Sequence, residues 1–278
     1  MSDAFKLVKD RYGAAAQSAP LPLDSGRLIN DTTRTILQHK SVRRFLPEKL
    51  DPGTLELLVA AGQSAASSSN LQAWSVVAIE DADRKDKAAF LCGDQDFIRN
   101  APLFLVFCAD LDRLTSVSDQ HQKPGEALQY LELVLLASGD AMLAAQNATI
   151  AAESLGLGAC YVGGARNNPR ELADLLGLPP RVVGLVGLAV GKPDPAAPGS
   201  IKPRLPQSEV LHREIWNNEG QEKNFREYDQ TIRDFNVGQG REGETWTGRA
   251  SERVATVASM HGRHVWTEVL KERKLDIK

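Results

Sequence analysis

Cysteine is scarce in this sequence, and its placement limits what it can do. The 278 residues contain three cysteines, Cys92, Cys108 and Cys160, and no two of them form a Cys-x-x-Cys pair. An odd number of widely spaced thiols does not build a disulfide framework. Cys108 and Cys160 lie in apolar runs, so we expect these two to be buried, reduced thiols, which are typical of a cytoplasmic protein.

An excess of charge of one sign is also lacking. Lys and Arg total 33 against 36 for Asp and Glu, a formal net charge of −3, so no global field favours nucleic acid as a partner. The N-terminus lacks the apolar segment of a secretory signal. The one long apolar stretch, residues 126–155, contains Gln146, Asn147 and Glu153, which would be costly in lipid. Burial inside protein explains this stretch better than a membrane does.

Familiar nucleotide and metal motifs are missing as well. Residues 156–161 lack the third glycine of a dinucleotide fingerprint, and residues 187–193 lack the spacing and the Ser or Thr of a P-loop. His261 and His264 lie three residues apart on an expected helix, without a carboxylate in metalloprotease spacing. We expect no metal site.

What the sequence does contain is a stretch that is apolar almost all the way round. Residues 126–155 carry four formal charges and no proline, which predicts a helix buried on all sides. Its alanines and Gly139 leave room for another backbone, so we expect this helix to lie between two subunits. A short strand follows at 159–162, and Gly163-Gly164 then exposes bare backbone that a flat ligand can approach.

Apolar runs and turn residues predict the other elements. Strands are expected at 75–79, 103–109 and 182–190, the last one broken by glycines. Helices are expected at 31–37, 83–91, 169–176, 221–235 and 251–271. Another helix should begin after Asp51, which would be its cap, with Pro52 at the first helical position. The expected organisation is an N-terminal arm (1–30) with one short helix at most, because Ala-Pro-Leu-Pro at 19–22 cannot continue a helix, an α+β core (31–206) and a C-terminal helical excursion (207–278).

Three clusters of basic and hydroxyl residues lie far apart in the chain: residues 39–43 (HKSVR), 67–69 (SSS) and 202–204 (KPR). Arginine, lysine and serine side chains are what a phosphate monoester needs. Taken singly, each cluster is also typical of a solvated loop.

Together with their surroundings, these clusters resemble a known family. The segments are HKSVRRF (39–45), SSSNLQAWS (67–75), Gln95 before LFLVFCAD (103–110), AQNATIAAESLGLGACYVGGARNNP (145–169) and IKPRLP (201–206). They resemble the FMN-dependent nitroreductase family, in particular its NADPH-oxidising major nitroreductase and flavin reductase group. The resemblance implies a nitroreductase-like α+β sandwich: a central mixed or antiparallel sheet wrapped by helices, with the long central helix at the interface of a homodimer.

The resemblance also implies which residues bind FMN. His39, Lys40, Ser41, Lys202 and Arg204 would hold the phosphate end, and Arg43 would lie near N1 and O2 of the flavin ring. Gln72 and Gln95 would meet the pyrimidine edge. The remaining contacts would come from the partner subunit's copies of Ser67, Ser68, Ser69 and Asn70, and from Tyr161, Val162, Gly163 and Gly164, with the Gly163 amide near N5. Arg43 and Gly163 would be the catalytic pair.

The implied activity is ping-pong transfer of hydride from NADPH or NADH to a nitroaromatic, a quinone or a similar acceptor. A flavin reductase that releases free reduced flavin is one alternative, and a non-catalytic FMN store or redox sensor is another. Candidate ligands for the 2′-phosphate of NADPH are Arg241, Arg249 and Arg253. These arginines could equally form solvated pairs with the nearby Glu242, Glu244 and Glu252.

Overall fold

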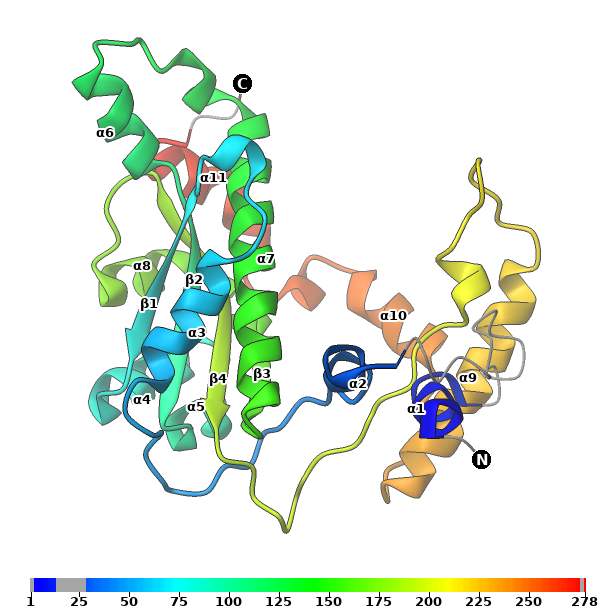
Figure 1. The fold of residues 1–278 in the computed structure, drawn as a ribbon. Helices are drawn as coiled ribbons and strands as arrows, with labels where there is room; N and C mark the ends of the chain where they lie inside the picture. Colours follow the sequence, from blue (N-terminus) through cyan, green and yellow to red (C-terminus); the bar gives the residue numbers. More distant parts are fainter. Residues whose placement is uncertain (1–2, 14–28, 276–277) are drawn as a thin grey trace. The chain divides into compact units, whose positions relative to one another are not determined.

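The computed structural model describes residues 3–13, 29–275 and 278, and the chain in it forms two units (Figure 1). The sheet unit comprises Ser41–Gly199 and His261–Lys278. The helical unit comprises Met1–Lys40 and Ser200–Met260. The proline segment expected at 19–22 lies outside the described residues.

The sheet has four strands, all antiparallel to their neighbours, in the order β1-β2-β4-β3. The strands are β1 (Trp74–Ile79), β2 (Leu103–Asp110), β3 (Gly158–Val162) and β4 (Val182–Gly191). Each overlaps an expected strand, which confirms the four predictions.

The glycines of β4 do not break it, contrary to expectation. A Cβ built at Gly187 would lie 2.4 Å from Cζ of the Phe104 ring, and one at Gly191 would lie 2.9 Å from Cδ1 of Phe45. The strand therefore stays continuous because these glycines make room for aromatic rings that cross it.

Helices cover both faces of the sheet (Figure 1). One face carries α3 (Thr54–Gln63) and α7 (Leu131–Ser154). The other carries α4 (Ala82–Leu91), α5 (Asp96–Asn100) and α8 (Pro169–Leu176). Two further helices of this unit are α6 (Asp112–Gln120) and α11 (Trp266–Glu272).

The alternation of side chains along β2 builds both halves of the core. Leu103, Leu105 and Phe107 pack in the cluster with α3 and α7. Phe104 and Val106, from the same strand, pack in the cluster on the opposite face. All of β2 is buried, so this central strand fixes the positions of both helical layers.

The long helix α7 is covered on one side only within a single chain. Leu135 is 58% exposed and Leu143 is 50% exposed, so burial on all sides would require a partner. Its alanines face the core of the same chain, and a Cβ at Gly62 of α3 would lie 3.3 Å from the Ala144 carbonyl oxygen. The close approach that the small residues allow is therefore made by α3, while Leu131, Leu135, Met142 and Leu143 are exposed.

The helical unit consists of α1 (Asp3–Tyr12), α2 (Asp31–Leu37), α9 (Gln221–Gly238) and α10 (Trp246–Val254), with short turns. Asn30 caps the first turn of α2. The Asn30 side chain accepts from the Thr33 amide at 2.9 Å, and Thr33 Oγ1 accepts from the Asn30 amide.

Several predicted helix ends were wrong. Helix α3 begins at Thr54 rather than after Asp51, because Gly53 adopts a left-handed conformation (φ 84°) that cannot lie inside a helix. The single helix expected at 251–271 is instead α10, two 3-10 turns and α11. His261 (φ 50°) and Gly262 (φ 83°) interrupt it, so His261 and His264 do not share a helix.

Candidate functional site

The glycine pair after β3 forms the start of a 3-10 turn, Gly163–Arg166. The two glycines have different surroundings. A Cβ at Gly164 would lie 2.0 Å from the Cys92 carbonyl oxygen, so packing requires glycine there. A Cβ at Gly163 would meet only the guanidinium nitrogens Nη2 of Arg166, at 3.6 Å, and of Arg263, at 4.0 Å. Gly163 thus leaves an approachable backbone beside two cations.

Gln95 lies against this turn. Its Nε2 donates to the Cys92 carbonyl oxygen at 2.7 Å and lies 3.1 Å from the Cβ position of Gly164. Because the amide nitrogen is used inside the protein, the side-chain oxygen Oε1 is the acceptor that Gln95 has to offer a ligand.

The segment that contains Ser41 and Arg43 lies beside β3, the strand that precedes the glycine turn. Ser41 forms an isolated parallel bridge with Ala159 of β3, and the Val42 amide donates to the Ala159 carbonyl oxygen at 3.0 Å. The exposed Arg43 guanidinium carbon lies 5.9 Å from the centroid of the Phe97 ring.

The pKa of the Cys160 thiol also reflects the closeness of Ser41 and Arg43 to β3. Burial raises the pKa of the Cys160 thiol, whereas the charge of Arg43 and a hydrogen bond with Ser41 oppose that rise. Within the sheet unit, the structure therefore places Ser41 and Arg43 along β3, near Ala159 and Cys160, and Gln95 against the glycine turn that follows this strand.

Tyr161 connects this strand end to α7. Its hydroxyl accepts from Thr149 Oγ1 at 3.0 Å and donates to Gln146 Oε1 at 3.4 Å. Burial raises the pKa of Tyr161 to about 12, so the phenol stays protonated near neutral pH and serves as a hydrogen-bonding group.

The serine loop has a separate anchor, the buried carboxylate of Asp140 on α7. This side chain is 3% exposed. It accepts from Ser67 Oγ at 2.6 Å, from the Ser68 amide at 3.2 Å and from the Ala73 amide at 3.2 Å. Three charge-assisted hydrogen bonds hold the loop to the helix.

The other end of this loop is held by Arg113, which donates from Nη1 to the Gln72 carbonyl oxygen at 2.6 Å. Ser69, Asn70 and Gln72 all have positive φ, between 49° and 54°, a region in which residues other than glycine are rare. The anchors at both ends keep this unusual backbone in place while Ser68, Ser69, Asn70 and Gln72 remain exposed.

The basic residues of the phosphate prediction that belong to the helical unit are joined through Arg11 of α1. Arg11 Nη2 donates to the His39 carbonyl oxygen at 2.8 Å, and Nη1 donates to the Lys202 carbonyl oxygen at 3.2 Å. The Arg204 amide donates to the Arg11 carbonyl oxygen at 2.9 Å. His39 and the 202–204 segment are therefore brought together, and Lys40 follows directly in the chain.

The arginines considered for NADPH also belong to the helical unit. Arg249 forms an ion pair with Glu244 at 3.5 Å. This is a pairing of the kind that the sequence analysis gave as the alternative to binding NADPH. Arg241 lies over the Phe235 ring, 5.8 Å from its centroid. Arg253 is exposed. Arg241 and Arg253 therefore stay better candidates than Arg249 for binding an anionic ligand.

Sequence reasoning missed five residues of these sites: Arg11, Arg113, Asp140, Arg166 and Arg263. Arg166 Nη1 donates to the Leu185 carbonyl oxygen at 2.6 Å, and Arg263 Nε donates to Asn167 Oδ1 at 2.8 Å. Asp140 was visible as a rare charge in an apolar helix. Arg263 had no local signal, because its position depends on how the C-terminal segment packs.

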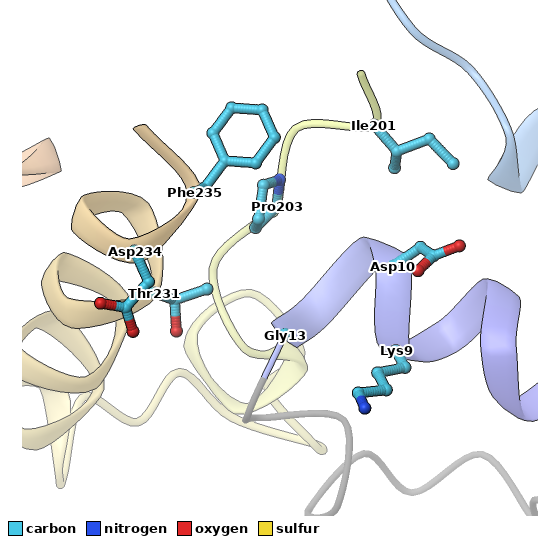
Figure 2. A pocket seen from close by; sticks show the side chains of 8 residues that line it. All are labelled: Lys9, Asp10, Gly13, Ile201, Pro203, Thr231, Asp234 and Phe235. Carbon is cyan, nitrogen blue, oxygen red and sulfur yellow. The ribbon is translucent and has the colours of Figure 1, made fainter. Parts of the chain in front are cut away.

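Two pockets lie elsewhere. The pocket in Figure 2 belongs to the helical unit and has a volume of about 410 Å³. Its charged side chains are Lys9, Asp10 and Asp234, a balance that does not favour an anion. The second, of about 590 Å³, belongs to the sheet unit and is lined in part by Lys85. Neither is lined by Arg43 or Gly163.

The fold and the glycine turn define an α+β protein of the nitroreductase type, and comparison with known proteins agrees. Residues 36–192 match the Nitroreductase family, and residues 202–278 match the Nitroreductase family, C-terminal domain. The chain belongs to this family, which confirms the predicted fold class.

Individual relatives cover nearly the whole chain. The FMN reductase (NADPH) of Bacillus subtilis (strain 168) is 35% identical over 250 residues, which are 88% of this chain and 98% of the relative. The structure of B. megaterium NfrA2 is 33% identical and superposes with a TM-score of 0.85 over 90% of this chain and 100% of its own. The NADPH:FMN oxidoreductase from Vibrio harveyi, complexed with NAD⁺, is 31% identical with a TM-score of 0.78 over the same shares.

Proposed function

We propose that this protein is an FMN-dependent NAD(P)H oxidoreductase that reduces nitroaromatics, quinones or similar acceptors. The observation that carries the proposal is the approachable backbone of Gly163, flanked by guanidinium groups, in a chain whose relatives include an FMN reductase and an NADPH:FMN oxidoreductase. Reduction of free flavin is the second candidate activity, and the name of the Bacillus relative favours it.

The residues present fit FMN in chemistry. The ring of FMN is flat and carries acceptor atoms along one edge, and Gly163 offers close approach beside Arg166 and Arg263. The phosphate is a dianion, and Lys202 and Arg204 supply cations of the kind that bind it. The sheet unit thus has donors that suit the ring, and the helical unit has cations that suit the phosphate.

Each residue of the sheet unit has a defined task in this proposal. When bound, FMN supplies the chemistry, taking a hydride at N5 from the nicotinamide and passing electrons to the acceptor. The Gly163 amide would hold N5, and Arg43 would place positive charge near N1 and O2, where reduction adds negative charge. Gln95 would accept from the pyrimidine N–H through Oε1, while one hydrogen of its Nε2 is donated to the Cys92 carbonyl oxygen.

We also propose a homodimer formed through the outward face of α7. Leu131, Leu135, Met142 and Leu143 are between 41% and 58% exposed. Leu131, Leu135 and Met142 share one face of the helix, because they are spaced by four and seven residues. A row of large apolar side chains on a helix marks an interaction face. Asp140 lies on the same helix, so a partner docked on α7 would meet the serine loop in a fixed position.

For the organisation of the chain, we propose that residues 31–206 supply the FMN-binding core and that residues 207–278 cover the active site or the partner. Residues 261–278 of this second segment belong to the sheet unit. The site of action is the cytoplasm. NADPH is the preferred donor, supported by the names of the relatives and by Arg241 in its glycine-rich loop.

The flavin content of the purified protein tests this proposal. Mass spectrometry of the supernatant after denaturation should find FMN at about one molecule per chain. Finding FAD alone, or no flavin after incubation with FMN, would contradict the proposal. A steady-state screen of NADPH and NADH against a nitroarene, a quinone and free FMN then separates the two activities. A protein that binds FMN but turns over none of them would be a flavin store.

A further inference from the structure

The N-terminal helix α1 carries a buried arginine that the proposed chemistry does not explain. Arg11 is 7% exposed, and residue 11 lies before both segments that match the family, 36–192 and 202–278. Burying a guanidinium costs free energy unless its donors are paired. The partners of Arg11 therefore indicate what this helix is for.

The guanidinium of Arg11 binds three backbone carbonyls from two distant segments. Nη2 donates to Leu37 at 2.7 Å and to His39 at 2.8 Å, and Nη1 donates to Lys202 at 3.2 Å. The backbone of Arg11 adds a fourth bond, because its carbonyl oxygen accepts from the Arg204 amide at 2.9 Å.

The residues fixed in this way are the expected phosphate ligands. A carbonyl is one covalent bond from the Cα of its own residue, so holding the carbonyls of His39 and Lys202 also holds the points from which their side chains extend. The rigid fork of arginine can satisfy several acceptors at once, whereas the single ammonium of lysine cannot do so in the same geometry.

Helix α1 is itself anchored within the helical unit. Leu7 and Val8 are each 3% exposed. The Tyr12 hydroxyl accepts from Gln207 Nε2 at 3.2 Å, and a Cβ at Gly13 would lie 2.6 Å from Cγ2 of Thr231 on α9. Arg11 therefore extends from a fixed support.

We propose that Arg11 is a positioning residue for phosphate binding, which makes α1 a part of the flavin site although it contributes no ligand. The proposal rests on FMN being the cofactor. It predicts that Arg11 matters for the phosphate and not for the ring.

Riboflavin, which has the ring but no phosphate, separates these two contributions. Apoprotein would be titrated with FMN and with riboflavin, following the quenching of flavin fluorescence. In Arg11→Ala the Kd for FMN should rise about 10- to 100-fold, the size expected for losing charged hydrogen bonds. The Kd for riboflavin should stay within about twofold of the wild type. The Kd of Arg11→Lys for FMN should lie between those of the wild type and Arg11→Ala.

Lys9→Ala is the matched control, because it removes one cation from the exposed side of the same helix and should change neither Kd. An equal loss of affinity for both flavins in Arg11→Ala, or no loss for either, would overturn the positioning role. If Arg11→Ala does not accumulate as folded protein, Arg11→Lys decides alone: a reduced preference for FMN supports the role, and the wild-type preference overturns it. A wild-type protein that binds FMN no better than riboflavin would instead refute the proposed phosphate site.

Discussion

Alanine substitutions at the two neighbouring glycines of the β3 turn should affect different properties, the stability of the fold at Gly164 and the binding of FMN at Gly163. At Gly164 the new Cβ would lie 2.0 Å from the Cys92 carbonyl oxygen and 2.8 Å from its carbonyl carbon. A relaxed carbon–oxygen contact is about 3.3 Å or longer, so two backbone segments must separate by about 1 Å. Overpacking typically costs about 1–3 kcal/mol and sometimes more. Because backbone rather than a side chain must move, we expect Gly164→Ala to lose at least ~3 kcal/mol.

Gly163→Ala should leave the apoprotein nearly unchanged. The new Cβ would meet only the ends of two long side chains at 3.6 Å or more, which is ordinary van der Waals contact, and the backbone there lies outside the left-handed region. The free energy of unfolding should therefore change by no more than about 0.5 kcal/mol. The methyl group does narrow the approach to the Gly163 amide, so FMN should bind about tenfold more weakly, a loss of ~1.4 kcal/mol.

Urea unfolding of the two apoproteins, followed by FMN titration of the folded variant, measures both effects. The pair serves as its own control, because the residues are adjacent and the substitution is the same. If Gly163→Ala binds FMN as tightly as the wild type, the flavin does not lie against Gly163. If Gly164→Ala is as stable as the wild type, the turn is not packed against Cys92 as described.

Three further predictions follow from the same structure. Asp140→Ala should lower the free energy of unfolding, measured by urea denaturation, by ~3 kcal/mol or more. The substitution removes an acceptor shared by three donors, at least one of them buried. A loss below ~1 kcal/mol would contradict the anchoring of the serine loop by Asp140. Burial raises the pKa of Cys92 and of Cys108 to about 12, so a thiol reagent near neutral pH should label neither before unfolding. The native thiols then keep protons that the unfolded chain loses, so stability should be full below about pH 9 and should decline towards about pH 12; a flat alkaline profile would be inconsistent with this. Leu135→Glu and Leu143→Glu should give soluble protein that sediments as a monomer, and an unchanged dimer would place the interface elsewhere.

The fold could be predicted because its signals are local. Strand β2 is an uninterrupted apolar run, α2 begins at an asparagine cap, and α8 follows Asn168-Pro169. The outward face of α7 could not be assigned, since a sequence that is apolar all round does not show which side meets the sheet. The alanines suggested a subunit contact, but the packing of α3 uses them inside the chain.

The site was predictable where the family motifs lie and not beyond them. The group around Ser41, Arg43 and Gly163 came from the resemblance. Asp140 accepts hydrogen bonds from residues 67 and 73 positions away in the sequence, and Arg11 donates to Lys202, 191 positions away. No local sequence pattern encodes contacts over such separations. The break at His261 and Gly262 was missed for a related reason, because a left-handed conformation is set by packing rather than by residue type alone.

The most direct test of the central claim is an anaerobic half-reaction. The FMN-loaded protein would be mixed with NADPH in a stopped-flow instrument while the absorbance of the oxidised flavin is followed, and a quinone or nitroarene would be added afterwards. The yellow colour should be lost rapidly and should return on addition of the acceptor, and neither step should occur in a sample lacking NADPH. Loaded protein that stays yellow with both NADPH and NADH would contradict the claim that this chain is an oxidoreductase.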